Sequence, residues 1–409
     1  MKIAILTGGF LPVLDGVTVG WFYRLQKLSE FGYEVLFLCP DYSDLEHLYP
    51  NWEDYVGNIL PGIRVVGVAS IPFIGVDFER NISQKSYPQI LQELRQFQPD
   101  ILHVEEPERL FIGSFKLFPG LDYSRQAKIP CVACFRTNFS EYLEDFFGFH
   151  PLVISGLQAL LKKLLGIIYN RYDLTLVPSA ITQQKLIKIG INNTRYADLN
   201  GFDFDRFDLS LRDLEFFQKN YNLPQADQQI KLVFVGRLTP DKGWNFTLSA
   251  LPQILVNLGI ETVALIIVGD GQMRAEIAQT LGQVTPHVHF LGRVSPENIP
   301  AVLLNSDIYV TTSEKENRSV TLIEALGAGL PAIAPKAGGV VQDIQIGWNG
   351  FLFDPQNTEQ FSQALEKLVN DSDLRQEMGA RSREYGAQFS WDHTVRNLVE
   401  QWQQQIQQY

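Results

Sequence analysis

Short runs of apolar residues recur along the chain, and most of them are separated by segments long enough to form a helix. Runs rich in Val, Ile and Leu that alternate with helices are typical of parallel strands buried on both faces of a sheet. In the first half the predicted strands are KIAIL (2–6), YEVLFLC (33–39), IRVVGVA (63–69), DILHVE (100–105), IPCVACF (129–135) and LTLVPS (174–179). In the second half they are KLVFVGR (231–237), VALIIVG (263–269), VHFLGR (288–293), DIYVTTS (307–313) and PAIAPK (331–336). The glycine-containing loop 7–16 and a predicted helix from Val17 to about Glu30 complete a first βα unit.

The two series of strands predict two Rossmann-like, doubly wound parallel-sheet domains, an α/β fold. We expect the first domain to span residues 1–207 and the second residues 208–389, because NGFDFDRF (200–207) and a polar stretch separate the two series. Residues 390–409 carry apolar side chains at helical spacing and predict an amphipathic helix that packs back on the first domain. Since ligands of open α/β sheets bind beyond the carboxyl ends of strands, the two domains are expected to face a central cleft.

Composition and charge exclude several classes of protein. The net charge of −12 leaves no basic surface for a nucleic acid. The six histidines are scattered and form no metal-binding motif, so no dedicated metal site is expected. Cys131 and Cys134 lie in a predicted buried strand, where residues three apart point to opposite faces, so they are interpreted as core residues. No run of about 18 apolar residues that could span a bilayer and no features of a signal peptide are found, and a cytoplasmic location is expected.

Two cations follow the first strand of the second series. Arg237 lies at the carboxyl end of KLVFVGR, and Lys242 follows a proline-containing turn in RLTPDKG. A planar guanidinium and a compact ammonium group that reach one anion suit a diphosphate.

Two glutamates, Glu316 and Glu324, flank the predicted start of a helix near Ser319 or Val320. The free amide groups of a helix start favour an anion. Glu316 is therefore expected near the group attached to the phosphates. Glu324 either reaches a hydroxyl pair of the same ligand, such as that of a sugar, or only caps the helix in a box with Thr321.

In combination, these motifs resemble the donor-binding domain of glycosyltransferase family 4. The C-terminal motifs that match in order and spacing are VGRLTPDKG (235–243), IIVGDG (266–271), FLGRV (290–294), ENRSVTLIE (316–324), ALGAGLPAIAPKAGG (325–339) and NGFLFDP (349–355). The N-terminal half matches less tightly, through FLPVLDGVT (10–18), PDILHVEEPE (99–108), LVPS (176–179) and NGFDFDRF (200–207).

The resemblance implies the glycosyltransferase-B fold and a retaining hexosyltransferase that moves a sugar from a nucleotide sugar, most commonly a UDP-sugar, to a hydroxyl acceptor. It implies that Glu316 contacts the donor sugar in a catalytic role. The donor-binding residues that it implies are Gly16, Arg237, Lys242, Arg293, Val294, Ser319, Val320 and Glu324. Among these, Arg293 and Val294 are expected at the base and Glu324 at the ribose. No cofactor and no divalent metal are expected to be required, since cations and helix amides can stabilise the leaving diphosphate.

Three positions depart from the family pattern. Glu105 stands where many relatives have the second histidine of an H-x-H pair, so we expect it to orient a substrate or to act as a general base if its pKa allows. Arg136 replaces a frequent histidine before a threonine. Arg318 lies where glycines are common, and it either adds a positive charge to the site or points to solvent.

The acceptor and the competing activities stay open. The aromatic- and leucine-rich segment 139–173 contains Lys162 and Lys163, and it either contacts a membrane from the cytoplasmic side or supplies long helices that cover the sheet. A lipid or a small glycoside is therefore expected as the acceptor. A sugar-nucleotide epimerase or a phosphorylase on the same fold is the alternative. An NAD-dependent dehydrogenase is less favoured, because the GxGxxG fingerprint is missing.

Overall fold

The computed structural model describes residues 1–73, 76–114, 120–136 and 151–409. The chain divides into two compact units. The N-terminal unit comprises the described residues up to Asn200 together with Trp391–Tyr409, and the C-terminal unit spans Gly201–Ser390. Residues 201–207 therefore belong to the second unit and not to the first, because Phe202 and Phe207 are buried in its core.

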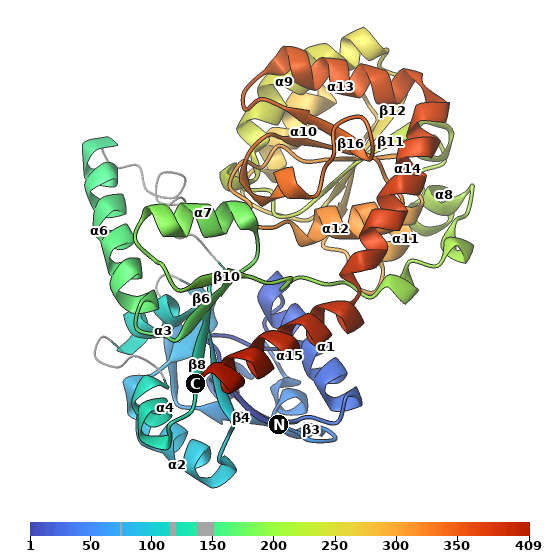
Figure 1. Ribbon diagram of the computed structural model, residues 1–409. Coiled ribbons are helices and arrows are strands. Elements are labelled where there is room, and N and C mark those ends of the chain that lie inside the picture. Colours follow the sequence, from blue (N-terminus) through green and yellow to red (C-terminus); the bar gives the residue numbers. More distant parts are fainter. Residues whose placement is uncertain (74–75, 115–119, 137–150) are drawn as a thin grey trace. The chain divides into compact units, whose positions relative to one another are not determined.

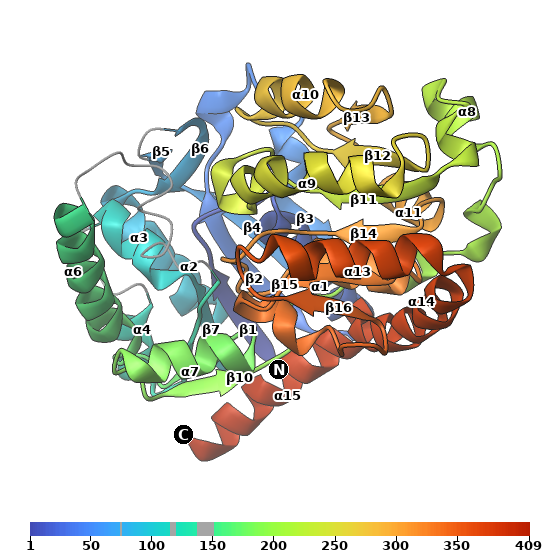
Figure 2. The ribbon, with the colours of Figure 1, turned by 90° about the horizontal axis from the view of Figure 1, so that it is seen from above.

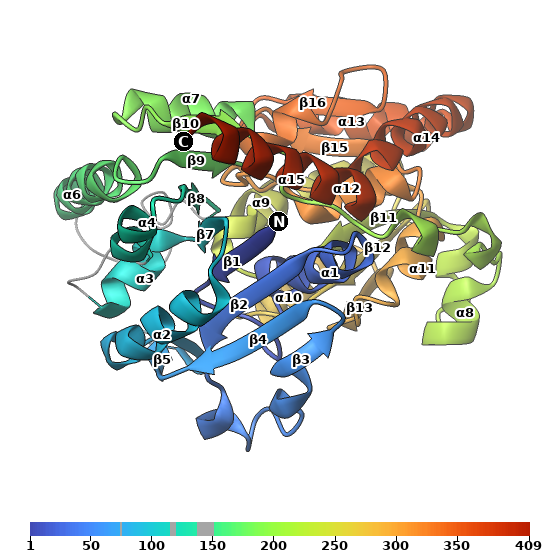
Figure 3. The same ribbon diagram turned by 60° about the horizontal axis from the view of Figure 1, so that its bottom comes forward.

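The described part of the N-terminal unit contains an eight-stranded sheet with the order β10-β9-β8-β7-β1-β2-β4-β3. Figure 3 shows β8, β7, β1, β2, β4 and β3 in this order. All neighbours are parallel except β3, which is antiparallel to β4 at the edge. The strands are β1 (Lys2–Leu6), β2 (Glu34–Pro40), β3 (Gly57–Leu60), β4 (Ile63–Val68), β7 (Ile101–Glu105), β8 (Cys131–Cys134), β9 (Leu174–Val177) and β10 (Thr194–Tyr196). A separate hairpin joins β5 (Ser70–Phe73) and β6 (Val76–Ile82).

Helices cover both faces of this sheet because its strands are apolar on both sides. The helices of the unit are α1 (Gly16–Glu30), α2 (Tyr87–Phe97), α3 (Pro107–Ser114), α4 (Leu121–Ala127), α6 (Pro151–Tyr169), α7 (Ala180–Lys188) and α15 (Trp391–Gln408). Ile3 and Ile5 point to the core formed with α1 and α15, whereas Ala4 and Leu6 point to the opposite core, as the two-residue period of a strand requires. The closing helix lies alongside α1 (Figure 1) and buries Trp402 completely.

The C-terminal unit contains a six-stranded sheet in its described residues, with the order β13-β12-β11-β14-β15-β16 (Figure 2), and all its pairs are parallel. The strands are β11 (Ile230–Val235), β12 (Val263–Val268), β13 (Val288–Gly292), β14 (Ile308–Val310), β15 (Ala332–Pro335) and β16 (Gly350–Phe353). The helices are α8 (Phe216–Tyr221), α9 (Trp244–Leu258), α10 (Arg274–Gly282), α11 (Ile299–Leu304), α12 (Val320–Gly327), α13 (Thr358–Asn370) and α14 (Ser372–Gly386). One core packs α9, α10 and α13 on the sheet, and the other packs α8, α11 and α12 on the opposite face.

All strands predicted from apolar runs are confirmed within a few residues, and so are the first helix and the closing helix. Strands without such runs were not predicted, among them β3, β10 and the β5–β6 hairpin, whose residues are partly polar and exposed. The expectation that no segment is apolar enough to span a membrane is wrong by length and composition. The 18 residues Leu152–Tyr169 of α6 have a mean hydropathy of 1.6, and only 17% of them are buried. Lys162 and Lys163 interrupt this run, which is why a search for unbroken apolar residues misses it.

Candidate active site

Loops from several strands gather at the carboxyl edge of the C-terminal sheet. A Cβ atom on Gly243, after β11, would lie 2.1 Å from the carbonyl oxygen of Thr312, which follows β14. A Cβ atom on Gly269, after β12, would lie 1.9 Å from the carbonyl oxygen of Gly236. Gly243 and Gly269 both have a positive φ, which other residues rarely adopt. Glycine at these positions therefore lets the loops after neighbouring strands touch backbone to backbone, and the loops form one surface.

Lys242 and Glu316 meet on this surface. Lys242 ends the short 3₁₀ helix Pro240–Lys242, and its Nζ lies 2.5 Å from Oε1 of Glu316, which lies between β14 and α12. Both side chains are mostly buried, with exposed fractions of 22% and 16%. The structure thus brings together Lys242, which the sequence predicts to bind phosphate, and the first glutamate of the E-x7-E motif.

Arg237 lies on the same loop as Lys242, but its side chain is 60% exposed. Its Nη2 donates to Oδ2 of the buried Asp241 at 2.8 Å. This contact holds the guanidinium group at one end and leaves much of it open to solvent. An exposed, anchored guanidinium group can form the two parallel hydrogen bonds that a phosphate accepts.

The start of α12 is capped by Ser319, whose Oγ accepts a hydrogen bond of 3.2 Å from the amide of Leu322. The expected box of Thr321 and Glu324 is not formed, because the Thr321 hydroxyl bonds to the Tyr309 hydroxyl at 2.8 Å. Within the described residues, the backbone amides of Val320 and Thr321 have no hydrogen-bond acceptor. These amides are the groups that an anion would need at a helix start.

Glu324 is partly buried in the second turn of α12. Its carboxylate makes no hydrogen bond or ion pair with the residues that the structure describes, so it does not serve as a helix cap. Burial raises the pKa of Glu324 to about 7. A carboxyl group without a protein partner and with a raised pKa is typical of a ligand-binding position.

Arg293 and Val294 follow β13 at the same edge of the sheet. The loop is tied to the neighbouring one, since the amide of Gly269 donates to the carbonyl of Gly292 at 2.7 Å. The Arg293 side chain is exposed, and Val294 packs partly against the core beneath the sheet. Both residues therefore lie on a loop that adjoins the one carrying Gly269.

Arg318 follows neither of the two expectations for it. Its side chain is 1% exposed and points into the unit, where Nη2 lies 3.0 Å from Oδ1 of the fully buried Asp343. Its guanidinium group also lies 4.6 Å from the centroid of the Phe389 ring. Arg318 thus adds no cation to the exposed surface and does not point to solvent, because a buried carboxylate attracts it inward.

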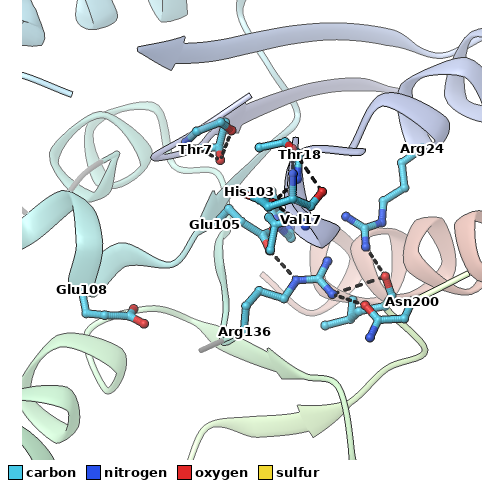
Figure 4. A network of polar contacts seen from close by, with 12 residues as sticks. Thr7, Val17, Thr18, Arg24, His103, Glu105, Glu108, Arg136 and Asn200 are labelled. Atoms are coloured by element: carbon cyan, nitrogen blue, oxygen red, sulfur yellow. Dashed lines mark hydrogen bonds and ion pairs between the residues drawn. The ribbon is translucent and has the colours of Figure 1, made fainter. Parts of the chain in front are cut away.

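In the N-terminal unit, Glu105 and Arg136 form a buried ion pair at the carboxyl ends of β7 and β8 (Figure 4). The Nε of Arg136 lies 2.5 Å from Oε1 of Glu105, and the side chains are 7% and 1% exposed. The other oxygen of Glu105 contacts Nε2 of His103 at 2.9 Å. Glu105 and Arg136, which both depart from the family pattern, therefore neutralise each other's charge.

His103 is oriented from its other side by the closing helix. The indole Nε1 of Trp402 donates to Nδ1 of His103 at 3.2 Å, and an indole nitrogen can only donate. The proton of the neutral imidazole is therefore on Nε2, which donates to Glu105. Burial lowers the pKa of His103 and keeps the ring neutral, although the charge of Glu105 acts in the opposite direction.

The general-base role of Glu105 is not supported by this geometry. Burial alone would raise the pKa of Glu105, but the charge of Arg136 and the hydrogen bond from His103 outweigh it and hold the pKa far below its usual range. Such a carboxylate is a poor proton acceptor near neutral pH. Its two oxygens instead hold Arg136 and His103 in place, which is an orienting role.

Arg24 and Asn200 are further members of this network. The sequence indicated Asn200 only as the first residue of the matching motif NGFDFDRF (200–207), and it did not indicate Arg24. Arg136 donates from Nη1 to the side-chain oxygen of Asn200 at 2.9 Å, and Arg24 donates to the carbonyl of Leu199 (Figure 4). Arg24 is fully buried, with its guanidinium group 4.8 Å from the Trp21 ring, and burial and the charge of Arg136 lower its pKa to about 9. The sequence of the first helix alone does not show that Arg24 is buried.

Three potential metal ligands, His103, Glu105 and Cys134, lie within 4.8 Å of one another in the described residues. The oxygens of Glu105 are already engaged by His103 and Arg136, and the guanidinium groups of Arg136 and Arg24 lie nearby. Positive groups beside a cluster disfavour a metal cation. The cluster is therefore better described as a structural polar network.

Gly16 begins α1 and is exposed. Apart from its chain neighbours and the backbone of α1 itself, no heavy atom of the described residues lies within 4 Å of a Cβ atom built on it, and its φ is not positive, so glycine is not required there by the described packing or by the backbone. Asp15 caps the helix by accepting from the amides of Val17 and Thr18 at 2.7 and 2.8 Å. The segment 139–173, which is predicted either to contact a membrane or to cover the sheet, is described only from residue 151 onward, and its first part lies outside the described residues.

Comparison with known proteins gives the class of the protein. The family described as "Glycosyl transferases group 1" matches residues 217–385, and "Glycosyltransferase Family 4" matches residues 14–197. Alr3699/HepE of Anabaena, solved in complex with UDP, shares the fold with a TM-score of 0.73 at 19% identity, covering 99% of this chain and 100% of its own. Sucrose-phosphate synthase from Thermosynechococcus elongatus gives a TM-score of 0.75 at 17% identity, with 100% of both chains covered. The fold and the two matches define a glycosyltransferase with the glycosyltransferase-B fold.

Curated relatives narrow the class. A GDP-mannose-dependent alpha-mannosyltransferase of Corynebacterium glutamicum is 27% identical over 98% of this chain and 88% of its own length. The sulfoquinovosyl transferase SQD2 of Arabidopsis thaliana is 26% identical over 90% of this chain and 66% of its own length. With a family match in each half of the chain, the protein belongs to the family 4-like glycosyltransferases.

Proposed function

We propose that the protein is a retaining hexosyltransferase that moves a hexosyl unit from a UDP-sugar to a hydroxyl acceptor. The observation that carries the proposal is the meeting of Lys242 and Glu316 beside the start of α12. A cation, a carboxylate and the start of a helix then lie close together along the chain or in space at the carboxyl edge of the sheet, where α/β folds bind ligands.

Each residue has a role in this proposal. Arg237, Lys242 and the amides of Ser319, Val320 and Thr321 bind the diphosphate and stabilise the negative charge that develops on it as it leaves. Glu316 exchanges its contact with Lys242 for the hydroxyl groups of the donor sugar. Glu324 accepts hydrogen bonds from the ribose hydroxyls, and the loop of Arg293 and Val294 contacts the base.

The N-terminal unit contributes two further proposed contacts. Gly16 offers its backbone to the donor phosphates, which is consistent with a glycine that its own unit does not require. Glu105 keeps an orienting role and holds Arg136 and His103 in place.

The proposed chemistry breaks the bond between the anomeric carbon and the phosphate oxygen and forms a bond from the acceptor oxygen to the same carbon on the same face. The departing phosphate oxygen takes the proton of the acceptor hydroxyl, so the products are a glycoside and a nucleoside diphosphate. No cofactor and no divalent metal take part, since Arg237, Lys242 and the helix amides supply the positive charge.

A GDP-hexose is the second candidate donor. It is favoured by the GDP-mannose-dependent relative, which is similar over nearly the whole chain. The difference lies in the base, and the loop after β13 would have to accommodate guanine in place of uracil. A lipid or a small glycoside is the proposed acceptor, and the proposed location is cytoplasmic with peripheral contact at the inner face of a membrane.

Calorimetric titration with UDP, GDP, ADP and NAD tests the donor assignment, with Arg237→Ala as the matched variant. UDP is expected to bind selectively and to lose affinity in the variant. Binding of GDP alone would favour a GDP-hexose as the donor in place of a UDP-sugar. Binding of NAD alone would contradict the proposed function.

A second experiment tests the reaction class. A UDP-hexose is incubated with and without acceptor alcohols, and the anomeric configuration of the product is read by NMR. Retained configuration and dependence on the acceptor are expected. Turnover of the donor without an acceptor would indicate an epimerase, turnover with inorganic phosphate alone would indicate a phosphorylase, and inverted products would contradict retention.

A further inference from the structure

Arg318 lies two residues after Glu316 and is anchored inside the C-terminal unit. Its ion pair with Asp343 is buried on both sides, with exposed fractions of 1% and 0%, and the distance from Nη2 to Oδ1 is 3.0 Å. The ring of Phe389 lies 4.6 Å from the guanidinium group. An arginine buried this deeply fixes the backbone that carries it, because its charge cannot leave a buried carboxylate without a large cost.

Asp343 is itself a fixed anchor. It follows the 3₁₀ helix Gly338–Gln342, and its amide donates to the carbonyl of Val340 at 3.1 Å. Its Oδ1 accepts a hydrogen bond of 3.1 Å from the hydroxyl group of Tyr385. The side chain of Asn349, which is completely buried, donates to the carbonyl of Asp343 at 2.9 Å. The asparagine of the NGFLFDP motif therefore helps to hold the partner of Arg318.

The loop of Glu316 is attached to the same 3₁₀ helix at a second point. The amide of Gly339 donates to the carbonyl of Glu316 at 2.6 Å. A Cβ atom on Gly339 would lie 1.8 Å from the carbonyl oxygen of Asn317, so the two backbones are in direct contact. One attachment is at Glu316 and the other at Arg318, immediately before Ser319 caps α12.

We propose that Arg318 is a positioning residue for the donor site. Through Asp343 it fixes the place of the Glu316 carboxylate and the direction of the first amides of α12. The inference rests on the proposed function, because it assigns these two groups to the donor. A displacement of about 1 Å in such groups lowers the rate of catalysis by up to about 100-fold.

The competing explanation is that the ion pair only stabilises the fold. A buried ion pair is weak evidence for stability, because replacement of both partners by neutral groups is often tolerated, whereas loss of one partner leaves an unpaired charge. The two explanations therefore differ for a variant that lacks both charges. A structural pair predicts that such a variant recovers fully, and a positioning pair predicts that it recovers stability alone.

The experiment compares Arg318→Met, Arg318→Lys and the double variant Arg318→Met with Asp343→Asn. Asparagine keeps the oxygen that accepts from Tyr385. The control is Arg383→Met, because Arg383 donates to the carbonyls of Gly327 and Phe207 away from the Glu316 loop. Five quantities are measured: the midpoint of thermal unfolding, the affinity for the nucleoside diphosphate, kcat, KM for the donor, and amide exchange of residues 314–322.

Arg318→Met is expected to lower the unfolding midpoint by about 10 °C, because it leaves Asp343 unpaired. The double variant is expected to recover most of this shift but to keep at least a tenfold loss in kcat/KM, about what a small misplacement costs, and faster amide exchange at 314–322. Arg318→Lys is expected to restore part of kcat, since it returns the charge. Kinetics and exchange like those of the wild type in the double variant would overturn the proposal, as would an equal kinetic loss in Arg383→Met.

The results also distinguish a failure of the positioning role of Arg318 from a failure of the proposed function. If the wild-type protein bound no nucleoside diphosphate, the proposed function would fail, and amide exchange would still decide whether Arg318 orders the loop. If the wild-type protein bound the diphosphate and the exchange of the loop were unchanged in both Arg318→Met variants, only the positioning role would fail.

Discussion

Glu324 combines a raised pKa with a carboxylate that the described residues leave without a partner, and this gives donor binding a characteristic pH dependence. Only the ionised group accepts hydrogen bonds from two ribose hydroxyls. With a pKa of about 7, the ionised fraction rises about tenfold between pH 6 and pH 8. The affinity for UDP, measured by calorimetry, is expected to rise by a similar factor over this range. Glu324→Gln is expected to bind more weakly and to keep only the pH dependence of the ligand's own phosphate.

The same carboxyl group predicts the sign of a stability change. The pKa of Glu324 is about 7 in the folded protein and 4.5 as a reference value, so the folded state holds the proton more tightly. The free energy of unfolding therefore falls as the pH rises from about 4.5 to 7. Glu324→Gln should lack this part of the fall in urea unfolding. Identical pH profiles for the wild type and the variant, in both binding and stability, would contradict the assignment.

Lys242, on the loop after β11, offers a test with a matched control at the start of that strand. Lys242→Ala removes a charged donor and is expected to weaken the binding of UDP by roughly 10- to 100-fold. Lys231 lies at the other end of β11, where it pairs with Asp307 at 2.9 Å. Lys231→Ala should leave the affinity unchanged in the same titration. Equal effects of the two variants would remove Lys242 from the donor site.

Glu105 and Arg136 neutralise each other's charge in a buried place, so the removal of one charge is expected to cost more stability than the removal of both. Arg136→Met leaves a buried carboxylate unpaired and is expected to lower the free energy of unfolding by about 3–5 kcal/mol. Adding Glu105→Gln should recover a large part of this loss in urea unfolding. A double variant that is no more stable than Arg136→Met would show that the ion pair is not the reason for the loss.

The sequence identified the residues of these ion pairs as candidates, but it did not show which of them contact each other. Glu105 and Arg136 are 31 positions apart, and Lys242 and Glu316 are 74 apart, so no local spacing connects them. The carboxyl ends of the parallel strands place them together, which the strand prediction indicated only in outline. The inward direction of Arg318 was not foreseen either, since it depends on Asp343 in another loop. The raised pKa of Glu324 depends on how deeply its carboxyl group is buried, and the hydrophobic periodicity of the sequence does not show this depth.

At the scale of elements, the apolar runs were sufficient for the central strands and insufficient at the edges. A central parallel strand is buried on both faces and needs an unbroken apolar run, which is what the pattern detects. β10 (Thr194–Tyr196) and the β5–β6 hairpin are partly exposed, so polar residues satisfy them and leave no run. The closing helix was predictable from spacing, but its hydrogen bond from Trp402 to His103 was not.

Helix α6 gives the prediction at this scale. Val153, Leu157, Leu160 and Ile167 are exposed at spacings of three, four and seven, which puts them on one side of the helix. If this apolar stripe enters the membrane interface, the protein should float with vesicles of phosphatidylcholine and phosphatidylglycerol. Leu157→Gln with Leu160→Gln should abolish flotation. Ser155→Gln with Ala159→Gln, which changes exposed positions away from the stripe, should not.

A protein that stays in the lower fraction at every lipid ratio would exclude membrane contact by α6. Flotation that is equally lost in both pairs of variants would show that the leucines have no special role. Transfer to a soluble acceptor should remain unchanged in all four substitutions, because none of them lies among the proposed donor contacts.

The whole molecule is expected to unfold in two steps, because each unit has hydrophobic cores of its own on both faces of its own sheet. The proposed donor contacts, Gly16 apart, lie in the C-terminal unit. At 100 times its dissociation constant, UDP stabilises the unit that binds it by about 2.7 kcal/mol. In differential scanning calorimetry it should therefore raise one transition by roughly 5–10 °C and leave the other nearly unchanged.

Trp402→Ala identifies the other transition. Trp402 lies close to the end of the chain, yet it is fully buried in the N-terminal unit and donates to His103. Its loss should lower only the transition that UDP does not raise, by several degrees, because the cavity and the lost hydrogen bond belong to that unit. Arg237→Ala should remove the shift caused by UDP without moving either transition far in the free protein. If Trp402→Ala lowered the transition that UDP raises, the assignment of the closing helix and the donor to different units would be wrong.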